Sequence, residues 1–144
     1  MTEIIKSEED KVAFIETFKR RTKKFVINNI NLFRQLPKTE EARIIGRQLL
    51  RSSSSVGANY RAACRARSQA EFHSKMSIVV EETDESLFWI EILVEAKIVN
   101  LNEVGVLLNE ANEILKVVSA ARKTASKKLI NHSKLTPSIT IYHD

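Results

Sequence analysis

The residues best suited to chemistry are arginines that recur along residues 39–67. If this segment is one helix, five arginine side chains fall within an arc of about 80°: Arg43, Arg47, Arg51, Arg61 and Arg65. They lie opposite the apolar positions Ile45, Leu49 and Val56. The planar arginine fork binds phosphates or carboxylates. This row therefore predicts an anion-binding surface.

A second basic row lies on the preceding segment. Its members fall within about 100° of one another on a helix: Arg20, Lys23, Lys24 and Arg34. Two basic rows on helices that follow each other in the chain can track a phosphate backbone. We therefore expect these nine residues to bind RNA or DNA.

The acidic side chains support a second interpretation of the arginines. Residues 19–67 hold thirteen Lys and Arg residues and two acids, whereas residues 71–95 hold seven acids and one lysine. One stripe of the acidic segment also carries apolar side chains: Glu71, Glu82, Glu85, Trp89 and Ile92. If this stripe pairs with the arginine row of a second copy, repetition closes a ring or grows a filament. Both partners stay open for the row on residues 39–67, and nucleic acid is favoured for residues 19–24.

No catalytic or metal-binding residues are predicted. His73, His132 and His143 lack the acid three residues earlier that di-metal bundle centres use. The chain has no Gly-rich phosphate loop and no nucleophile motif, and Cys64 is expected to be a small buried residue. We expect a non-enzymatic protein without cofactors. A metal or catalytic site assembled between subunits is the third alternative.

Composition and periodicity place these residues on helices. The chain of 144 residues has only three Gly and two Pro, whereas sheet-rich folds need both at their turns. Apolar residues recur at three- and four-residue steps, with capping signals at Ser7, Thr39 and Ser68 and a stop at Pro37. The predicted fold class is all-α, a single-domain antiparallel up-and-down four-helix bundle.

The predicted bundle covers residues 1–132, with helices at about 8–36, 39–67, 68–99 and 102–132, and residues 133–144 form a tail. Asn102 is expected to cap the fourth helix. The run Ser52–Ser55 with Gly57 is expected to let a neighbouring helix approach closely, in preference to forming a loop or a kink.

The expected location is the cytoplasm. A lone cysteine cannot form a disulfide within the chain. The first residues lack the pattern of a signal peptide, and no apolar stretch approaches the roughly 20 residues of a membrane span. We therefore expect no contact with a membrane.

The stretch VGANYRAACRARSQAEFHSKMSIVVEETDESLFWIEILVE resembles the four-helix-bundle proteins related to those encoded in intervening sequences of bacterial 23S ribosomal RNA. With the RQLP turn and the fourth helix, the resemblance covers about residues 12–128. It rests on these features: Ala58 and Asn59 after a small residue, the basic run 61–67, the Ser68 and Glu71 capping box with Phe72, and Asp84, Glu85 and Trp89.

The resemblance implies a bundle that assembles into a homopentameric ring without catalytic residues. Similar accessory proteins of diversity-generating retroelements use a basic ring surface to engage nucleic acid and a reverse transcriptase. The first hypothesis is therefore an oligomeric bundle that binds structured RNA or DNA by shape and charge. The alternative is a protein-interaction scaffold whose arginines serve subunit contacts, with no nucleic-acid role.

Overall fold

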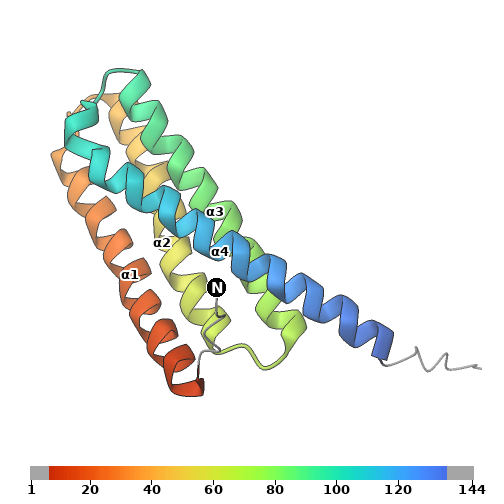
Figure 1. Ribbon diagram of the computed structural model, residues 1–144. Coiled ribbons are helices and arrows are strands. Elements are labelled where there is room, and N and C mark those ends of the chain that lie inside the picture. The colour runs from red at the N-terminus through yellow and green to blue at the C-terminus, as the bar shows by residue number, and fades with distance from the viewer. Residues whose placement is uncertain (1–6, 136–144) are drawn as a thin grey trace, which may run out of the picture.

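The structure is a computed structural model that describes residues 7–135. Its helices are α1 (Glu8–Gln35), α2 (Glu40–Cys64), α3 (Gln69–Glu95) and α4 (Leu101–Leu135). Short connections make successive helices antiparallel, and each packs against the next (Figure 1). The contact between α2 and α3 is the most extensive, and that between α1 and α4 is the smallest. The predicted all-α four-helix bundle is confirmed.

Side-chain caps define where the first three helices begin. Ser7, Thr39 and Ser68 accept hydrogen bonds from backbone amides in the first turns of α1, α2 and α3. At Ser7 the Asp10 carboxylate accepts in return from the Ser7 amide, which completes a capping box. These caps satisfy amides that a helix N-terminus would otherwise leave unpaired. The sequence predicted all three positions, but at Ser68 only the serine half of the predicted capping box with Glu71 is formed.

The connection between α3 and α4 differs from the prediction. α3 ends at Glu95, not near residue 99, because Lys97 adopts a left-handed backbone conformation (φ 60°). The amides of Ile98 and Val99 then donate to the Leu93 carbonyl, at 2.9 and 3.1 Å. α4 already begins at Leu101, so the expectation that Asn102 caps it is wrong.

The other predicted helix ends also differ. α2 stops at Cys64, three residues before its predicted end, where the Arg65 amide donates to the Ala62 carbonyl and the Ala66 amide to the Ala63 carbonyl as the chain turns. α4 continues to Leu135, so residues 133–135 of the predicted tail are helical. The rest of that tail, residues 136–144, lies outside the described residues.

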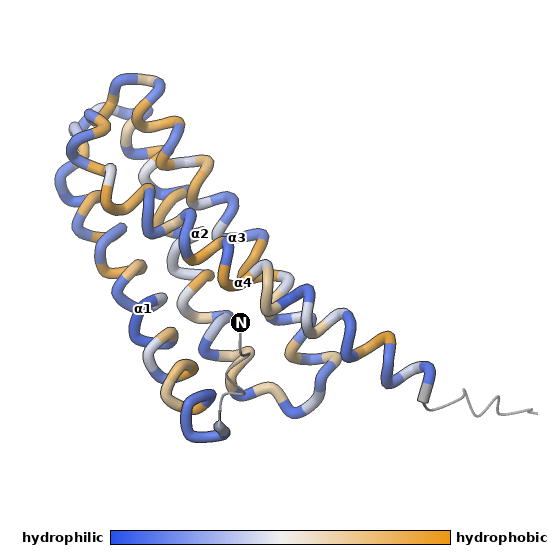
Figure 2. Tube along the Cα trace, viewed as in Figure 1, coloured by the Kyte–Doolittle hydropathy of each residue, from blue (hydrophilic) through white to orange (hydrophobic). Residues whose placement is uncertain are grey.

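The core is built from one apolar side of each helix. Figure 2 shows apolar residues recurring along each helix between hydrophilic ones. The largest fully buried side chains come from all four helices: Phe25, Leu49, Val56, Met76, Val79, Ile90, Leu93, Val104, Ile114 and Val118. Within the described residues, no helix is long and apolar enough to cross a membrane.

Small residues on α2 bring its neighbours close. Ser52 and Ser86 are fully buried, and the Ser86 hydroxyl donates to Ser52 Oγ at 2.9 Å across the α2–α3 contact. On the α1 side, a Cβ on Gly57 would lie 2.8 Å from Val26 Cγ2. α2 runs through this segment without a break. Ser52 and Gly57 therefore serve close packing, as expected from the sequence, whereas Ser54 of the same run is exposed.

Candidate functional site

A groove between α1 and α2 gathers several of the cations that the sequence pattern indicated. Its volume is about 540 Å³. α1 contributes Lys19, Arg20 and Lys23, and Arg61 and Arg65 come from the end of α2. The remaining lining is one acid and several small or apolar residues: Glu16, Val26, Ile27, Ser54, Gly57 and Ala58.

Most of the charge in this groove is not neutralised by the protein itself. Lys19 pairs with Glu16 at 2.7 Å, and this contact lowers the pKa of the Glu16 carboxyl. The Arg20 guanidinium donates to the Thr17 hydroxyl at 3.3 Å, and its charge also contributes to the lowered pKa of Glu16, without an ion pair between the two. In the described part of the chain, no acid lies within ion-pair distance of Lys23, Arg61 or Arg65. The groove therefore keeps about four positive charges available to an anionic ligand.

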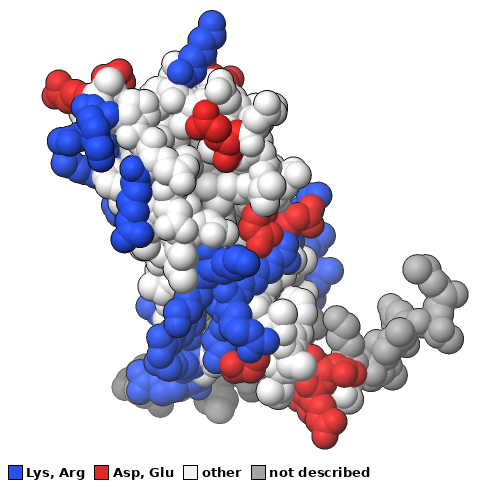
Figure 3. Space-filling model, turned by 90° about the vertical axis from the view of Figure 1, so that its left-hand side faces the viewer, with Lys and Arg blue, Asp and Glu red and all other residues white. Residues whose placement is uncertain are grey.

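The distribution of charge over the surface agrees with this. Figure 3 shows the side of the molecule to which α1 belongs, where Lys and Arg side chains form a nearly continuous area over the lower half. Acidic side chains lie mainly at its borders. Clustered cations of this kind raise the local concentration of polyanions, and added salt screens the effect.

The predicted row of five arginines on α2 is interrupted in its middle. Arg51 donates to the carboxylates of Glu82, at 3.5 Å, and Glu85, both on α3 of the same chain. Arg43 and Arg47 lie beyond this contact, beside a shallow depression at the start of α2. The structure thus brings Arg61 and Arg65 together with α1 cations, and separates them from the other three arginines.

The predicted row on α1 is also divided. Lys24 does not line the α1–α2 groove but a different depression, of about 680 Å³, between α1 and α4. Arg34 is exposed near the end of α1 and lines neither depression. Two consecutive lysines point about 100° apart on a helix, so Lys23 and Lys24 serve different surfaces.

The apolar part of the groove was not predicted from the sequence. Ile27 is 48% exposed and lies on the same side of α1 as Arg20 and Lys23. Residues three, four and seven apart share a helix face, so the spacing of Arg20, Lys23 and Ile27 contained this signal. Gly57 and Ala58 of α2 join the groove only because α1 packs against α2, and the residue spacing along one helix does not reveal that packing.

The predicted acidic and apolar stripe of α3 is partly occupied within the chain. Glu82 and Glu85 hold Arg51, and Glu71 lies 3.9 Å from Arg67. Trp89 and Ile92 are partly buried, and Trp89 packs against the core. Phe88, which the sequence pattern did not single out, is 49% exposed and meets the Trp89 ring edge-on at 4.9 Å.

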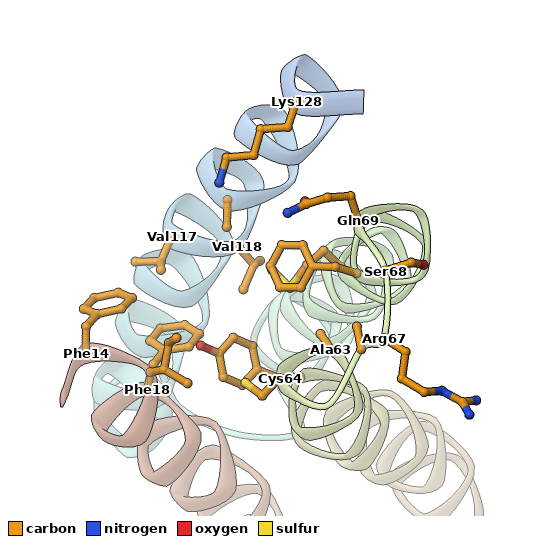
Figure 4. A pocket seen from close by; sticks show the side chains of 16 residues that line it. Phe14, Phe18, Ala63, Cys64, Arg67, Ser68, Gln69, Val117, Val118 and Lys128 are labelled. Carbon is orange, nitrogen blue, oxygen red and sulfur yellow. The ribbon is translucent and has the colours of Figure 1, made fainter. Parts of the chain in front are cut away.

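An apolar pocket of about 650 Å³ opens where α4 diverges from α1 (Figures 1 and 4). Figure 4 shows Phe14 and Phe18 of α1, Cys64 of α2 and Val118 of α4 around it. Burial raises the pKa of the Cys64 thiol, although a hydrogen bond with Tyr60 opposes this. A thiol with a raised pKa is a poor nucleophile at neutral pH.

One pair of residues that could form a nucleophile and a base lies elsewhere. Ser126 Oγ of α4 is 2.7 Å from His73 Nε2 of α3. Among the described residues, no carboxylate contacts the other ring nitrogen of His73, and neither residue lines the grooves described above. The structure also holds no cluster of three or more His, Cys, Asp or Glu side chains suited to a metal ion between residues 7 and 135.

A comparison with solved structures shows similarity in both sequence and fold. One of the matching structures is a protein of unknown function from the S23 ribosomal protein family of Bacteroides thetaiotaomicron, with 30% sequence identity and a TM-score of 0.68. The likeness covers 73% of this chain and 97% of the other. Comparison with curated proteins found no match.

A family comparison matches most of the bundle. Residues 17–120 match the family described as 23S rRNA-intervening sequence protein. The matched range includes all of α2 and α3, the α1–α2 groove from Lys19 onward, and more than half of α4. Neither this description nor that of the solved relative names an enzymatic activity. With this match and the 30% identity to the solved relative, the chain belongs to the 23S rRNA-intervening sequence protein family.

Proposed function

We propose that this protein is a non-enzymatic nucleic-acid-binding bundle whose contact surface is the α1–α2 groove. The observation that carries the proposal is the convergence of Arg20, Lys23, Arg61 and Arg65 on one groove with no acid among the described residues paired to them. Each phosphate that these side chains neutralise would release condensed counterions, and this release drives binding.

Cations elsewhere on the bundle support this choice by contrast. Arg21 makes a bidentate pair with Glu110, and Arg51 is held by Glu82 and Glu85. These arginines stabilise contacts between helices. Cations whose only role is solubility have no reason to gather in one groove. The four groove cations come from two helices and line the same space, which favours a binding role.

The same contrast bears on the alternative role as a protein scaffold. That alternative pairs the α2 arginines with Glu71, Glu82 and Glu85 of a neighbouring copy. Because Glu82 and Glu85 already bind Arg51 of their own chain, a neighbour's arginines would have to displace it. We therefore propose self-association through the exposed apolar part of α3, around Phe88, with the groove left for nucleic acid. A homopentameric ring is the assembly that the family resemblance implies.

The direct test measures affinity for a structured RNA and a duplex DNA over a series of salt concentrations. The slope of log affinity against log salt falls by about 0.7–0.9 for each phosphate that the protein no longer neutralises. The variant R20Q/K23Q/R61Q/R65Q is expected to lower the slope by about three and to abolish tight binding at moderate salt. None of the four side chains belongs to the buried core, so the fold should persist.

A matched control removes the same number of charges outside the groove. The variant K24Q/R34Q/R43Q/R47Q carries the same net charge, and its four positions likewise lie outside the buried core. It is expected to retain most of the binding and of the salt slope. Equal losses in the two variants would show that net charge, not the groove, determines binding. Absence of binding by the unmodified protein at low salt, both to these probes and to single-stranded RNA and DNA, would refute the nucleic-acid function itself.

A further inference from the structure

The α1–α2 groove has a charged end and an apolar end. Gly57 faces Val26 and the Thr22 carbonyl, which fixes the alignment of the antiparallel helices. From that contact, residue numbers fall along α1 as they rise along α2, so Arg20 lies opposite Arg61 at the charged end. In the other direction, Ile27 lies opposite Ser54 at the apolar end. Both ends line the same space of about 540 Å³.

We propose that this groove holds an unpaired nucleotide strand, with phosphates at the charged end and a base against Ile27 and Ala58. The inference rests on the nucleic-acid function proposed above and names the form of nucleic acid that the groove fits. Single-stranded RNA and single-stranded DNA both offer these phosphates and unpaired bases.

The apolar end is the observation that favours an unpaired strand. Ile27 is 48% exposed although it lies among cations, and the core positions of α1 are filled by other residues. A base pair stacked inside a duplex offers only its edges and the sugar-phosphate backbone to a protein. An unpaired base has an open face that can cover an apolar side chain, as in proteins that bind single strands.

The shape of the groove agrees. Its volume of about 540 Å³ falls within the range of sites that enclose small ligands, about 300–1,000 Å³, so one or two nucleotides can enter it. A duplex is a wide, stiff cylinder that would rest on the side chains of α1 and α2 above the groove. In that position the duplex would reach the cations but leave Ile27 in water.

Ser54 adds a polar group at the apolar end. Its side chain is exposed, and no side-chain hydrogen bond to it is formed within residues 7–135. A serine hydroxyl both donates and accepts, so Ser54 can meet a base edge or a ribose hydroxyl. Together the groove supplies phosphate contacts, an apolar surface and a hydrogen-bonding group within one space.

The test compares four probes of matched length: oligo(U), oligo(dT), a blunt-ended RNA duplex and a DNA duplex. Each is titrated against the full chain over a salt series. Oligo(U) or oligo(dT) is expected to bind at least about tenfold more tightly than both duplex probes at equal salt. The comparison of oligo(U) with oligo(dT) shows whether the strand is RNA or DNA. Duplex binding that equals or exceeds single-strand binding would overturn the inference and leave the proposed function standing.

The variant Ile27→Ser isolates the apolar contact. It is expected to weaken single-strand binding about five- to tenfold, because it removes most of the apolar area that a base would cover. The salt slope should not change, since no cation is removed. Duplex binding should also stay the same. The control is Ile44→Ser, an isoleucine of α2 that is 52% exposed but lies outside the groove, and it should behave like the unmodified protein.

Photo-crosslinking of the unmodified protein gives an independent readout that needs no variant. Oligo(U) carrying 4-thiouridine, which also reacts with lysine side chains, is expected to crosslink to peptides that contain Lys23 to Ile27 or Ser54 to Arg61. Crosslinks confined to other helices would overturn the inference. So would an Ile27→Ser variant that loses the same affinity for duplex probes as for single-stranded ones. If no nucleic acid binds but an acidic helical peptide does, both this inference and the proposed function are wrong.

Discussion

Arg21 of α1 and Glu110 of α4 form a bidentate ion pair across the smallest helix contact of the bundle. Arg21 Nε lies 2.9 and 3.0 Å from the two carboxylate oxygens, and Nη2 lies 2.6 Å from Oε1. The pair raises the pKa of the Arg21 guanidinium, and the same side chain lies over the Phe18 ring at 5.9 Å. Because α1 and α4 share few other contacts, this pair stabilises the packing of α1 against α4.

Replacing Arg21 by methionine should therefore destabilise the bundle. Both partners are about one-third exposed, so screening by solvent limits the loss to about 1 kcal/mol. Urea denaturation measures it, and a double-mutant cycle with Glu110→Gln should show a coupling of similar size. Arg47 serves as the control because it is exposed in the interior of α2 and forms no ion pair among the described residues, and Arg47→Met should leave the midpoint unchanged. A coupling near zero would mean that the pair does not stabilise the fold.

Gly57→Ala and Gly105→Ala should change stability in opposite directions. Both glycines lie inside helices, where alanine is favoured by about 1 kcal/mol. At Gly105 nothing lies within 4 Å of the added Cβ, so stability should rise by about 0.5–1 kcal/mol. At Gly57 the Cβ would lie 2.8 Å from Val26 Cγ2, and a stiff β-branched side chain cannot turn aside cheaply.

The expected net effect of Gly57→Ala is a loss of about 1 kcal/mol, because overpacking costs more than helix propensity returns. Thermal or urea unfolding measures it. A second variant tests the stated cause: Val26→Ala in the Gly57→Ala background should recover part of the loss by removing Cγ2. A Gly57→Ala protein more stable than the unmodified one would show that α1 can shift freely.

The free energy of unfolding should fall at alkaline pH because of Cys64 and Tyr60. Burial raises the pKa of the Cys64 thiol above its ordinary 9.0 and that of the Tyr60 phenol above its ordinary 10.0. The unfolded chain releases these protons at lower pH than the folded chain does. Their contribution to stability is therefore complete below about pH 9 and is lost as pH rises through the folded-state values.

The variant Cys64→Ala separates the thiol from other alkaline titrations. Between about pH 6 and 8 its free energy of unfolding should run parallel to that of the unmodified protein. Above about pH 9 the unmodified protein should lose stability more steeply, and chemical denaturation at fixed temperature measures the difference. If the two plots of unfolding free energy against pH stay parallel up to about pH 10.5, burial does not raise the pKa of the Cys64 thiol.

Most of the fold was predictable because its signals are local. The caps at Ser7, Thr39 and Ser68 and the stop at Pro37 act within one helical turn, so the sequence shows them directly. The end of α3 was not predictable in this way. Residues up to Val99 continue the apolar periodicity, and only the left-handed conformation of Lys97 turns the chain toward α4.

The candidate site was predictable only in part because it depends on two helices. Helical spacing identified Arg20 with Lys23 and Arg61 with Arg65, but not that these pairs face one groove. The same spacing grouped Arg51 with them, although it is held by carboxylates of α3. One helix's periodicity gives the direction of a side chain relative to its own axis. The partner it meets depends on the packing of the neighbouring helix.

Phe88 should govern self-association if α3 contributes a subunit contact. Trp89 is partly buried in its own chain, and Glu82 and Glu85 are paired, so Phe88 is the most exposed large apolar residue of α3. Aromatic side chains are enriched at the centres of protein interfaces. Phe88→Lys should raise the dissociation constant of the oligomer at least about tenfold, as measured by sedimentation velocity over a range of concentrations.

Val106→Lys provides the matched control for this prediction. Val106 lies on α4 and is 87% exposed, so the substitution adds the same charge at another apolar surface position without disturbing the core. It should leave the dissociation constant unchanged. If Val106→Lys dissociates the oligomer and Phe88→Lys does not, the subunit contact lies on α4. If the unmodified protein sediments as a monomer at every concentration, the proposed self-association is wrong, and Phe88 is then one of several singly exposed apolar residues of the bundle.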